Sequence, residues 1–224
     1  MTDSQSRLQS RSVLDILYED DELIFVNKPP QLIVQRGYDP DEPVLLDLVN
    51  EHVGRPVDML QRLDRGTTGV IFFSKVSAHN AKLTRQFEKK RIQKRYSALC
   101  VGAIGERQTI DAPLARIGAI KFGVRDDGKR AVTHIEPIAF ARSASLLAIV
   151  LETGRTHQIR VHLAAIDHPL IGDWLYGERT SGRPMLHAAE LELTHPGTNQ
   201  RLRVRAPLPD DFLEEAKRSG LTLE

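Results

Sequence analysis

The sequence predicts an α+β fold in which a mixed, largely antiparallel sheet is flanked by helices, and two observations support this prediction. From residue 94 onward, short apolar runs rich in β-branched residues follow one another, separated by glycine-containing turns such as DDGK at 126–129. Helical patterns are interspersed among these runs without the regular strand–helix alternation of a parallel sheet. We therefore expect antiparallel pairing with a few covering helices.

The N-terminal half contains two expected strands and two expected helices. LIFVNK (23–28) is typical of a strand, which ends at the two prolines that follow because proline has no N–H to donate to a ladder. VLLDLVNEHV (44–53) favours a helix. GVIFFSK (69–75) is a short β-branched and aromatic run, as in a buried strand. Ser77 can cap a helix that follows, whose apolar residues are spaced i, i+4.

The remaining elements follow from the same patterns. Five further strands are expected, at residues 94–102, 131–140, 145–152, 185–193 and 200–207. Residues 156–167 predict a helix with its apolar side chains on one face. A short terminal helix at 211–220 is expected to close at Gly220, because glycine readily adopts the left-handed conformation that ends many helices.

The length of 224 residues suits one domain, and no linker divides it. Residues 1–12 are polar and aperiodic and are predicted to be disordered, with a single domain over 13–224. The start of the chain lacks the apolar segment of a secretory signal and no long apolar run occurs, so we expect a cytoplasmic protein that does not enter a membrane. The lone Cys100 excludes a disulfide within the chain and is typical of a buried thiol.

The distribution of charge is more informative than its sum, since the net charge is only +1. Residues 82–95, KLTRQFEKKRIQKR, hold seven lysines and arginines against the single Glu88. Such a run is usually a solvated helix face. As a group the residues also suit a surface that follows phosphates.

A second charged segment, ETGRTHQIRVHLAAIDHP, holds three histidines. His157, His162 and His168 are five and six positions apart, which does not stack them on one helical face, so the spacing argues against a zinc site. The Gly-Arg-Thr turn before the expected helix could instead bind an anion, through its free N–H groups and guanidinium. A capped helix with an arginine on its surface accounts for the pattern about as well.

Asp64, in QRLDRGTTG (61–69), raises the same choice between a local and a functional role. An aspartate in such a stretch most often holds a turn, which Gly66 and Gly69 would shape. A functional role needs the carboxylate kept ionised beside a guanidinium. The candidate partners are Arg62, Arg65, Arg155 and Arg160. Spacing alone favours the turn.

A set of motifs in order changes that balance. QRLDRGTTGVIFFSK (61–75) resembles the aspartate motif of the RluA-type pseudouridine synthases, usually written HRLD followed by a short turn and an apolar strand. KRYSALCVG (94–102) resembles their tyrosine motif, and LETGRTHQIRVHLAAIDHPLIGDWLYG (151–177) their arginine motif. MLHAAELELTHP (185–196) resembles their C-terminal strand signature, and LIFVNKPPQLIVQRG (23–37) their opening strand and loop. The resemblance covers nearly the whole chain.

The resemblance implies the pseudouridine synthase catalytic fold, with an active-site cleft on the sheet, and conversion of uridine in RNA to pseudouridine. The reaction is redox-neutral, so neither a cofactor nor a metal is expected. Asp64 is the implied essential carboxylate, either as a nucleophile or as a base that removes a ribose proton. Arg160 is implied to lie against Asp64 and hold it ionised with its guanidinium fork. Tyr96 is implied to cover the uracil; its alternative is ordinary strand packing.

Four further residues are implied to bind RNA. Ile159 would pack beneath the base, although its spacing also suits a core residue. Arg62 would occupy the space that a flipped nucleotide leaves, and Arg155 and His157 would bind flanking phosphates together with residues 82–95. The implied partner is ribosomal or transfer RNA, or both, acted on by a monomer.

The sequence departs from the family motifs at two places, and two other functions are weighed against a synthase. Gln61 stands where the family usually has histidine, and Pro30-Gln31 replaces a commoner pair of small residues. An RNA-binding protein that has lost catalysis is disfavoured because the aspartate, tyrosine and arginine positions are all filled. A hydrolase with an aspartate nucleophile would want a second acid or base group, and no paired carboxylate motif occurs.

Overall fold

The computed structural model describes residues 14–37, 42–178 and 182–221, and the predicted disorder of residues 1–12 lies outside these ranges. Within them the chain forms a ten-stranded sheet, a separate two-stranded sheet and four α-helices. This is an α+β fold, as the sequence predicts. No helix in the described ranges is long and apolar enough to cross a membrane.

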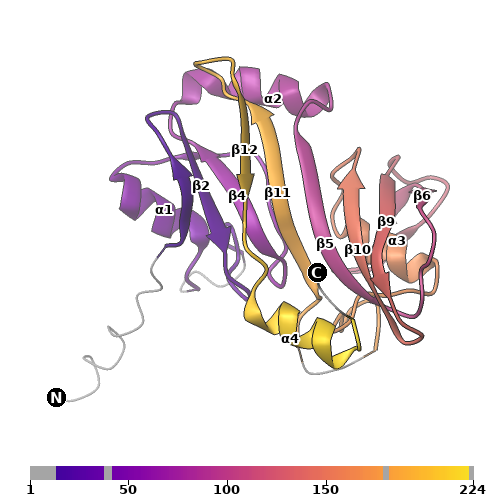
Figure 1. Ribbon diagram of the computed structural model, residues 1–224. Helices are drawn as coiled ribbons and strands as arrows, with labels where there is room; N and C mark the ends of the chain where they lie inside the picture. The colour runs from indigo at the N-terminus through magenta and orange to yellow at the C-terminus, as the bar shows by residue number, and fades with distance from the viewer. Residues whose placement is uncertain (1–13, 38–41, 179–181, 222–224) are drawn as a thin grey trace.

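The element bounds follow the expected order (Figure 1). The strands are β1 Ile16–Glu19, β2 Leu23–Lys28, β3 Asp58–Met59, β4 Thr68–Ser74, β5 Gln93–Val101, β6 Gln108–Asp111, β7 Leu114–Arg116, β8 Phe122–Val124, β9 Val132–Phe140, β10 Ala144–Leu151, β11 Leu186–Thr194 and β12 Arg201–Arg205. The helices are α1 Leu45–Val53, α2 Asn80–Glu88, preceded by the 3₁₀ turn Ser77–His79, α3 Gln158–Ala165 and α4 Asp210–Arg218.

The large sheet runs in the order β1-β2-β4-β11-β5-β10-β9-β6, with β12 beside β11 and β3 beside β4. All of its described pairings are antiparallel except that of β11 with β4, where His187 faces Thr68 and Ala188 faces Gly69. Gly69 has a φ of +105°, and a Cβ at this position would lie 2.3 Å from the carbonyl oxygen of Ala188. Only glycine therefore allows the two strands to approach at this point.

The helices cover both faces of the sheet. Leu83 of α2 packs in one core cluster and Ile159 of α3 in another, and Tyr96 of β5 contacts both clusters, which places α2 and α3 on one face. Leu45 of α1 and Phe212 of α4 pack against the alternate residues of the same strands, so these helices lie on the opposite face. In Figure 1, α2 crosses the upper ends of β11 and β5, and α4 lies across the lower end of the sheet.

The predicted strands and helices are confirmed to within a few residues, and Gly220 follows α4 with a φ of +75°. Two details were wrong. Ser77 caps no helix through its side chain, because its hydroxyl donates to Asp58 instead. The helix expected from Thr156 begins at Gln158, since His157 adopts a left-handed φ of 56° and belongs to the preceding loop.

Candidate active site

All seven site residues named from the sequence line one cleft, made of two adjoining hollows of about 340 and 70 Å³. The two hollows share the residues Arg62, Leu63, Asp64, Arg155 and His157. The smaller one is also lined by Tyr96, Ile159 and Arg160. The cleft thus joins the loop before β4, strand β5 and the N-terminal end of α3, which lie far apart in the sequence.

Asp64 lies in the loop between β3 and β4, which turns tightly because the Thr67 N–H donates to the Asp64 carbonyl at 3.1 Å. Its carboxylate is 31% exposed and faces Arg160. The carboxylate accepts no hydrogen bond from a backbone N–H of the described residues, so it does not hold the turn, contrary to the local interpretation. Gly66 is needed for another reason, since a Cβ there would lie 2.8 Å from Cδ of Pro184.

A buried lysine at the end of β2 holds the loop that carries Asp64. Lys28, at the end of β2, is fully buried, and its ammonium donates to the carbonyls of Pro29, Leu32 and Arg65 at 2.9, 2.7 and 3.0 Å. Burial lowers the pKa of Lys28 to about 7, and the nearby charge of Arg183 acts in the same direction. The guanidinium of Arg65 pairs with Glu42, which removes Arg65 from the candidate partners of Asp64.

A buried arginine, Arg183, links the same loop to helix α4. Arg183 is only 4% exposed and donates to the carbonyl of Gly66 at 3.1 Å. Its guanidinium fork also binds both carboxylate oxygens of Asp211 on α4, at 2.6 and 2.8 Å. The aspartate loop is therefore tied both to β2 and to the last helix.

Arg160 lies against Asp64 as expected, but its fork has a different partner. Its Nη1 is 3.4 Å from Asp64 Oδ2, whereas Nε and Nη2 donate to the two oxygens of Asp173 at 2.7 and 2.8 Å. Asp173 is fully buried. Burial opposes the charge of Arg160, yet the hydrogen bonds and charge of Asp173 raise its pKa. Arg160 is thus a fixed cation that presents one nitrogen to Asp64.

His157 approaches Asp64 from the other side. Its Nε2 lies 3.8 Å from Asp64 Oδ2, and its Nδ1 is 2.8 Å from the hydroxyl of Tyr176. That hydroxyl also accepts a hydrogen bond from the Phe122 N–H at 2.9 Å, which leaves its own proton available to donate to Nδ1 of a neutral His157. Burial lowers the pKa of His157, which favours the neutral ring with its Nε2–H directed toward Asp64. The guanidinium of Arg160 lies over the Tyr176 ring, 5.1 Å from its centroid.

The loop before α3 is held by Gln158, whose side chain is buried. Its Oε1 accepts from the Thr153 hydroxyl at 2.7 Å and from the Arg155 N–H at 3.0 Å. Its Nε2 donates to the Val132 carbonyl at 2.9 Å. The loop therefore has a fixed shape while the guanidinium of Arg155 stays exposed at the edge of the cleft.

Tyr96 and Ile159 form the apolar part of the cleft. Tyr96 is half-buried on β5, and burial together with the charge of Asp64 raises the pKa of its hydroxyl, which keeps it protonated. Ile159 is only 3% exposed and packs in the core below α3. It meets both expectations, because it belongs to the core and also lines the smaller hollow.

Comparisons with known proteins agree with this geometry. A model of the RNA pseudouridylate synthase family matches residues 22–165 of the chain. The ribosomal large subunit pseudouridine synthase D of Haemophilus influenzae is 36% identical to it, over 95% of the chain and 73% of that protein. The enzyme of the same name from Escherichia coli is 34% identical, over 95% of the chain and 72% of that protein.

The chain belongs to the RluA-type RNA pseudouridine synthases. Two solved structures share its fold. Human RNA pseudouridylate synthase domain containing 4 superposes with a TM-score of 0.76 at 24% identity, covering 93% of this chain and 94% of that one. The human domain containing 1 gives 0.75 at 23% identity, covering 96% and 98%. The protein is therefore an RNA pseudouridine synthase with the α+β catalytic fold of its relatives.

Sequence reasoning on the synthase missed four residues that shape the cleft, namely Lys28, Asp173, Tyr176 and Arg183. Asp173 and Tyr176 belong to GDWLYG at the end of the arginine motif, so their place in the motif was visible but their partners were not. Lys28 and Arg183 were given no role from the sequence. Their burial becomes evident only when the loops they join are brought together.

The two departures from the family pattern have structural consequences in this synthase. Gln61 is partly buried, and its side-chain nitrogen has no hydrogen-bond partner among the described residues. Gln31 has a φ of 64°, a left-handed conformation that a small residue such as glycine adopts without strain. The structure does not explain why these two glutamines replace the usual residues.

Proposed function

We propose that this synthase converts a uridine of large-subunit ribosomal RNA to pseudouridine, with Asp64 as its essential carboxylate. The supporting observation is the position of Asp64 in the cleft, where Arg160 and His157 approach the same oxygen at 3.4 and 3.8 Å. The names of the relatives favour ribosomal RNA over transfer RNA. Transfer RNA, also expected from the sequence, becomes the second substrate to test.

The reaction breaks the bond between N1 of uracil and C1′ of ribose and forms a bond between C5 and the same C1′. The proton on C5 is lost, and N1 gains one, so no atom is added or removed. Asp64 acts either as a nucleophile on the sugar or base, or as a base that removes a ribose proton. Both routes place the carboxylate against the reacting nucleotide, and the guanidinium of Arg160 lies 3.4 Å from Asp64 Oδ2.

Tyr96 and Ile159 are proposed to hold the uracil. Tyr96 stays protonated at neutral pH, so its hydroxyl can contact the base while its ring covers the apolar face. Ile159 offers a firm apolar surface on the opposite side, because it is packed in the core. This arrangement excludes water from the carboxylate once the base is bound.

Access to the target atom requires the nucleotide to leave the RNA stack, at a cost of a few kcal/mol. Arg62 is exposed, lines both hollows and makes no hydrogen bond or ion pair with the described residues, so it is available to occupy the space left by the flipped base. Arg155 and His157 are proposed to contact the phosphates that flank the target nucleotide. We expect a cytoplasmic monomer.

The test is to incubate wild type and Asp64→Ala with in vitro transcribed ribosomal and transfer RNA and to map pseudouridine. Wild type should modify ribosomal RNA, whereas Asp64→Ala should make no product and still bind RNA. Asp21→Ala serves as the control and should stay active, because it removes an exposed carboxylate that is distant from Asp64 in the sequence. The proposal fails if wild type modifies neither RNA, or if Asp64→Ala retains turnover.

A further inference from the structure

One face of the sheet is still without an assigned role. Arg95 directly precedes Tyr96 on β5, and successive side chains of a strand point to opposite faces, so Arg95 lies on the face opposite the cleft. There it pairs in register with Glu190 of β11, which pairs in turn with Arg205 of β12. In Figure 1, α4 covers only the lower end of this face, and the upper parts of β12, β11 and β5 are uncovered.

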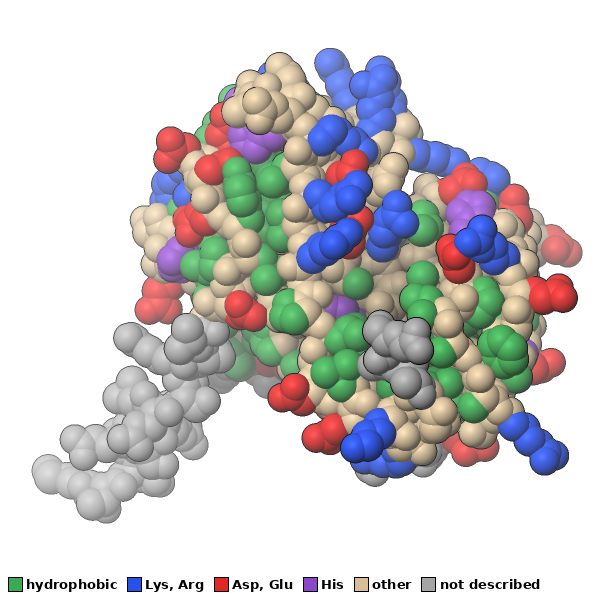
Figure 2. Space-filling view, in the orientation of Figure 1, with side chains coloured by type: hydrophobic (Ala, Val, Ile, Leu, Met, Phe, Trp, Pro, Cys, Tyr) green, Lys and Arg blue, Asp and Glu red, His purple; other side chains and the backbone are tan. Residues whose placement is uncertain are grey.

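The uncovered part carries a regular array of arginines. Arg201, Arg203 and Arg205 alternate along β12, about 6.6 Å apart by strand geometry, and Arg95 lies across β11 from them. We call these four residues the arginine ladder. Figure 2 shows Lys and Arg side chains gathered along this face and continuing to the top of the molecule.

Two glutamates beneath the ladder hold the arginines without neutralising them. Glu190 binds Arg95 at 3.2 Å and Arg205 at 2.6 Å. Glu192 binds Arg203 at 2.7 Å and also Arg201. The glutamate side chains are 9% exposed and the guanidiniums 47 to 71%. Four positive charges over two negative ones leave a net +2, with the remaining N–H donors facing solvent.

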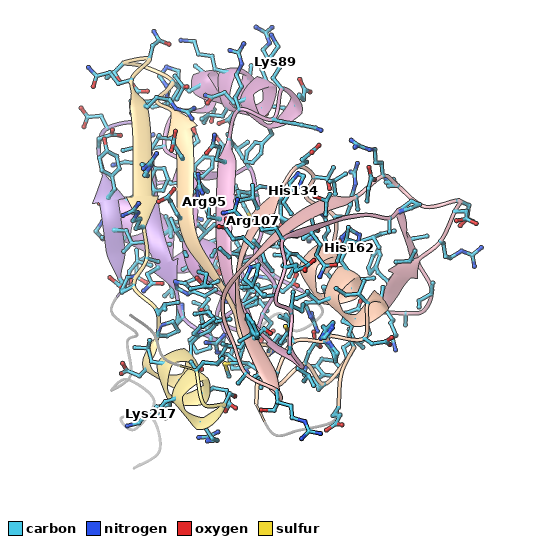
Figure 3. The ribbon with its side chains drawn as sticks, turned by 45° about the vertical axis from the view of Figure 1, so that its right-hand side comes forward. Lys89, Arg95, Arg107, His134, His162 and Lys217 are labelled. Carbon is cyan, nitrogen blue, oxygen red and sulfur yellow. The ribbon has the colours of Figure 1, made fainter. Side chains whose placement is uncertain are left out.

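Further cations lie around the upper end of the sheet, next to the ladder, where Arg201 donates to the carbonyl of Arg91 at 3.3 Å. A hollow of about 220 Å³ between α2 and the β11–β12 connection is lined by Lys82, Arg85, Lys89 and Arg91, and its lining includes no carboxylate. On the other side of Arg95, a hollow of about 400 Å³ is lined by Arg107, which pairs with Glu136, and by His134, which contacts Glu152, so this side adds no net positive charge. Figure 3 shows Arg95 near Arg107 and His134, with Lys89 above them, directly after the end of α2.

We propose that the arginine ladder and the basic edge of α2 form a second RNA-contact surface, which binds the sugar–phosphate backbone of a segment of the substrate outside the cleft. The proposal rests on the proposed function and adds a binding site to it. Pre-oriented guanidiniums match phosphate oxygens, and the ladder itself holds no aromatic residue on which a base could stack. The surface therefore recognises backbone charge, independently of sequence.

A purely structural explanation of the ladder makes a different prediction. β12 lies at an edge of the sheet, and charged residues on an edge strand discourage pairing with other chains. Edge protection would leave RNA affinity and its dependence on salt unchanged when arginines are replaced. Phosphate contacts release counterions, so each contact contributes to the slope of log Kd against log salt concentration.

The experiment compares the double variant Arg203→Gln, Arg205→Gln with wild type in binding in vitro transcribed large-subunit ribosomal RNA over a range of salt concentrations. Glu190 keeps Arg95 and Glu192 keeps Arg201, so no buried carboxylate is left without a partner. The matched control Lys217→Gln, Arg218→Gln removes the same charge from α4. Thermal melting by circular dichroism verifies that all three proteins fold.

We expect the ladder variant to bind roughly tenfold more weakly at low salt, with a salt slope smaller by about 1 to 2, and the control to match wild type. Pseudouridine formation at saturating enzyme should be retained, since the cleft is untouched. Equal salt slopes for the ladder variant and wild type would overturn the proposed RNA contact of the arginine ladder and leave the proposed function intact. If wild type does not bind this RNA, both the proposed RNA contact of the ladder and the proposed ribosomal substrate are overturned.

Discussion

Replacing Asp173 by asparagine tests how the cleft controls its central carboxylate. Asp173 is fully buried, and it fixes Arg160 through two hydrogen bonds of 2.7 and 2.8 Å. Asparagine has nearly the same shape but no charge, and its NH₂ group meets the N–H groups of the guanidinium. Removing one partner of a buried ion pair costs about 3–5 kcal/mol, so we expect a loss of this size in the free energy of unfolding.

The same change should slow catalysis more than it weakens RNA binding. Arg160 keeps its charge but loses its orientation toward Asp64, and a displacement of about 1 Å in a catalytic arrangement can cost roughly 100-fold in rate. Single-turnover formation of pseudouridine, measured at saturating and at limiting enzyme, separates the chemical step from binding. We expect kcat to fall about 100-fold with little change in RNA affinity.

Two further variants make this test specific. Asp127→Asn removes an exposed carboxylate paired with Arg125 and should change neither stability nor rate. Asp173→Glu keeps the charge and should retain more stability than Asp173→Asn if the ion pair matters. The reasoning is refuted if folded Asp173→Asn turns over at the wild-type rate, or if it loses affinity and rate in equal proportion.

The remaining predictions concern other buried or strained groups. Arg160→Lys should lower turnover at least tenfold, because an ammonium cannot bind Asp173 with a fork, and a near-normal rate would contradict this assignment. Lys28→Met should lower the free energy of unfolding by about 3 kcal/mol, since it leaves three carbonyls unpaired, and unchanged urea unfolding would exclude their role. Burial lowers the pKa of His162 and His187, so only the unfolded chain takes up these protons as the pH falls through about 6.5. Stability should therefore drop between pH 7 and pH 5, by up to about 4 kcal/mol for the pair, and a flat profile in urea melts would contradict it. Gln31→Gly relieves a left-handed φ and should add about 0.5–1 kcal/mol, whereas a loss of stability would show that the side chain compensates the strain.

The sequence predicted the central strands because their burial dictates their composition. All seven residues of β4 are buried, and the pattern of β-branched and aromatic residues shows this without a structure. β6 and β8 have no buried stretch of that kind, and their pairing depends on neighbours far along the chain. Local patterns cannot reveal strands of this type.

Some residues of the candidate site could be predicted from the sequence, whereas the contacts between them could not. The motif positions led directly to Asp64, Tyr96 and Arg160, which the fold brings to one cleft. Asp64 was the implied partner of the Arg160 fork, whereas the fork binds Asp173 and only Nη1 faces Asp64. A buried ion pair depends on which loops meet, and spacing along the chain carries little information about it.

The links from Lys28 and Arg183 to the aspartate loop also bear on how the enzyme is made. Arg183 joins the carbonyl of Gly66 to Asp211, so this second tie of the loop is complete only after α4 has been synthesised and docked. A nascent chain that has emerged only as far as β11 already contains every residue of the cleft but lacks the helix that holds Arg183 in place. We expect catalytic competence to arise only once α4 has emerged and docked, so that a chain lacking this helix does not modify RNA.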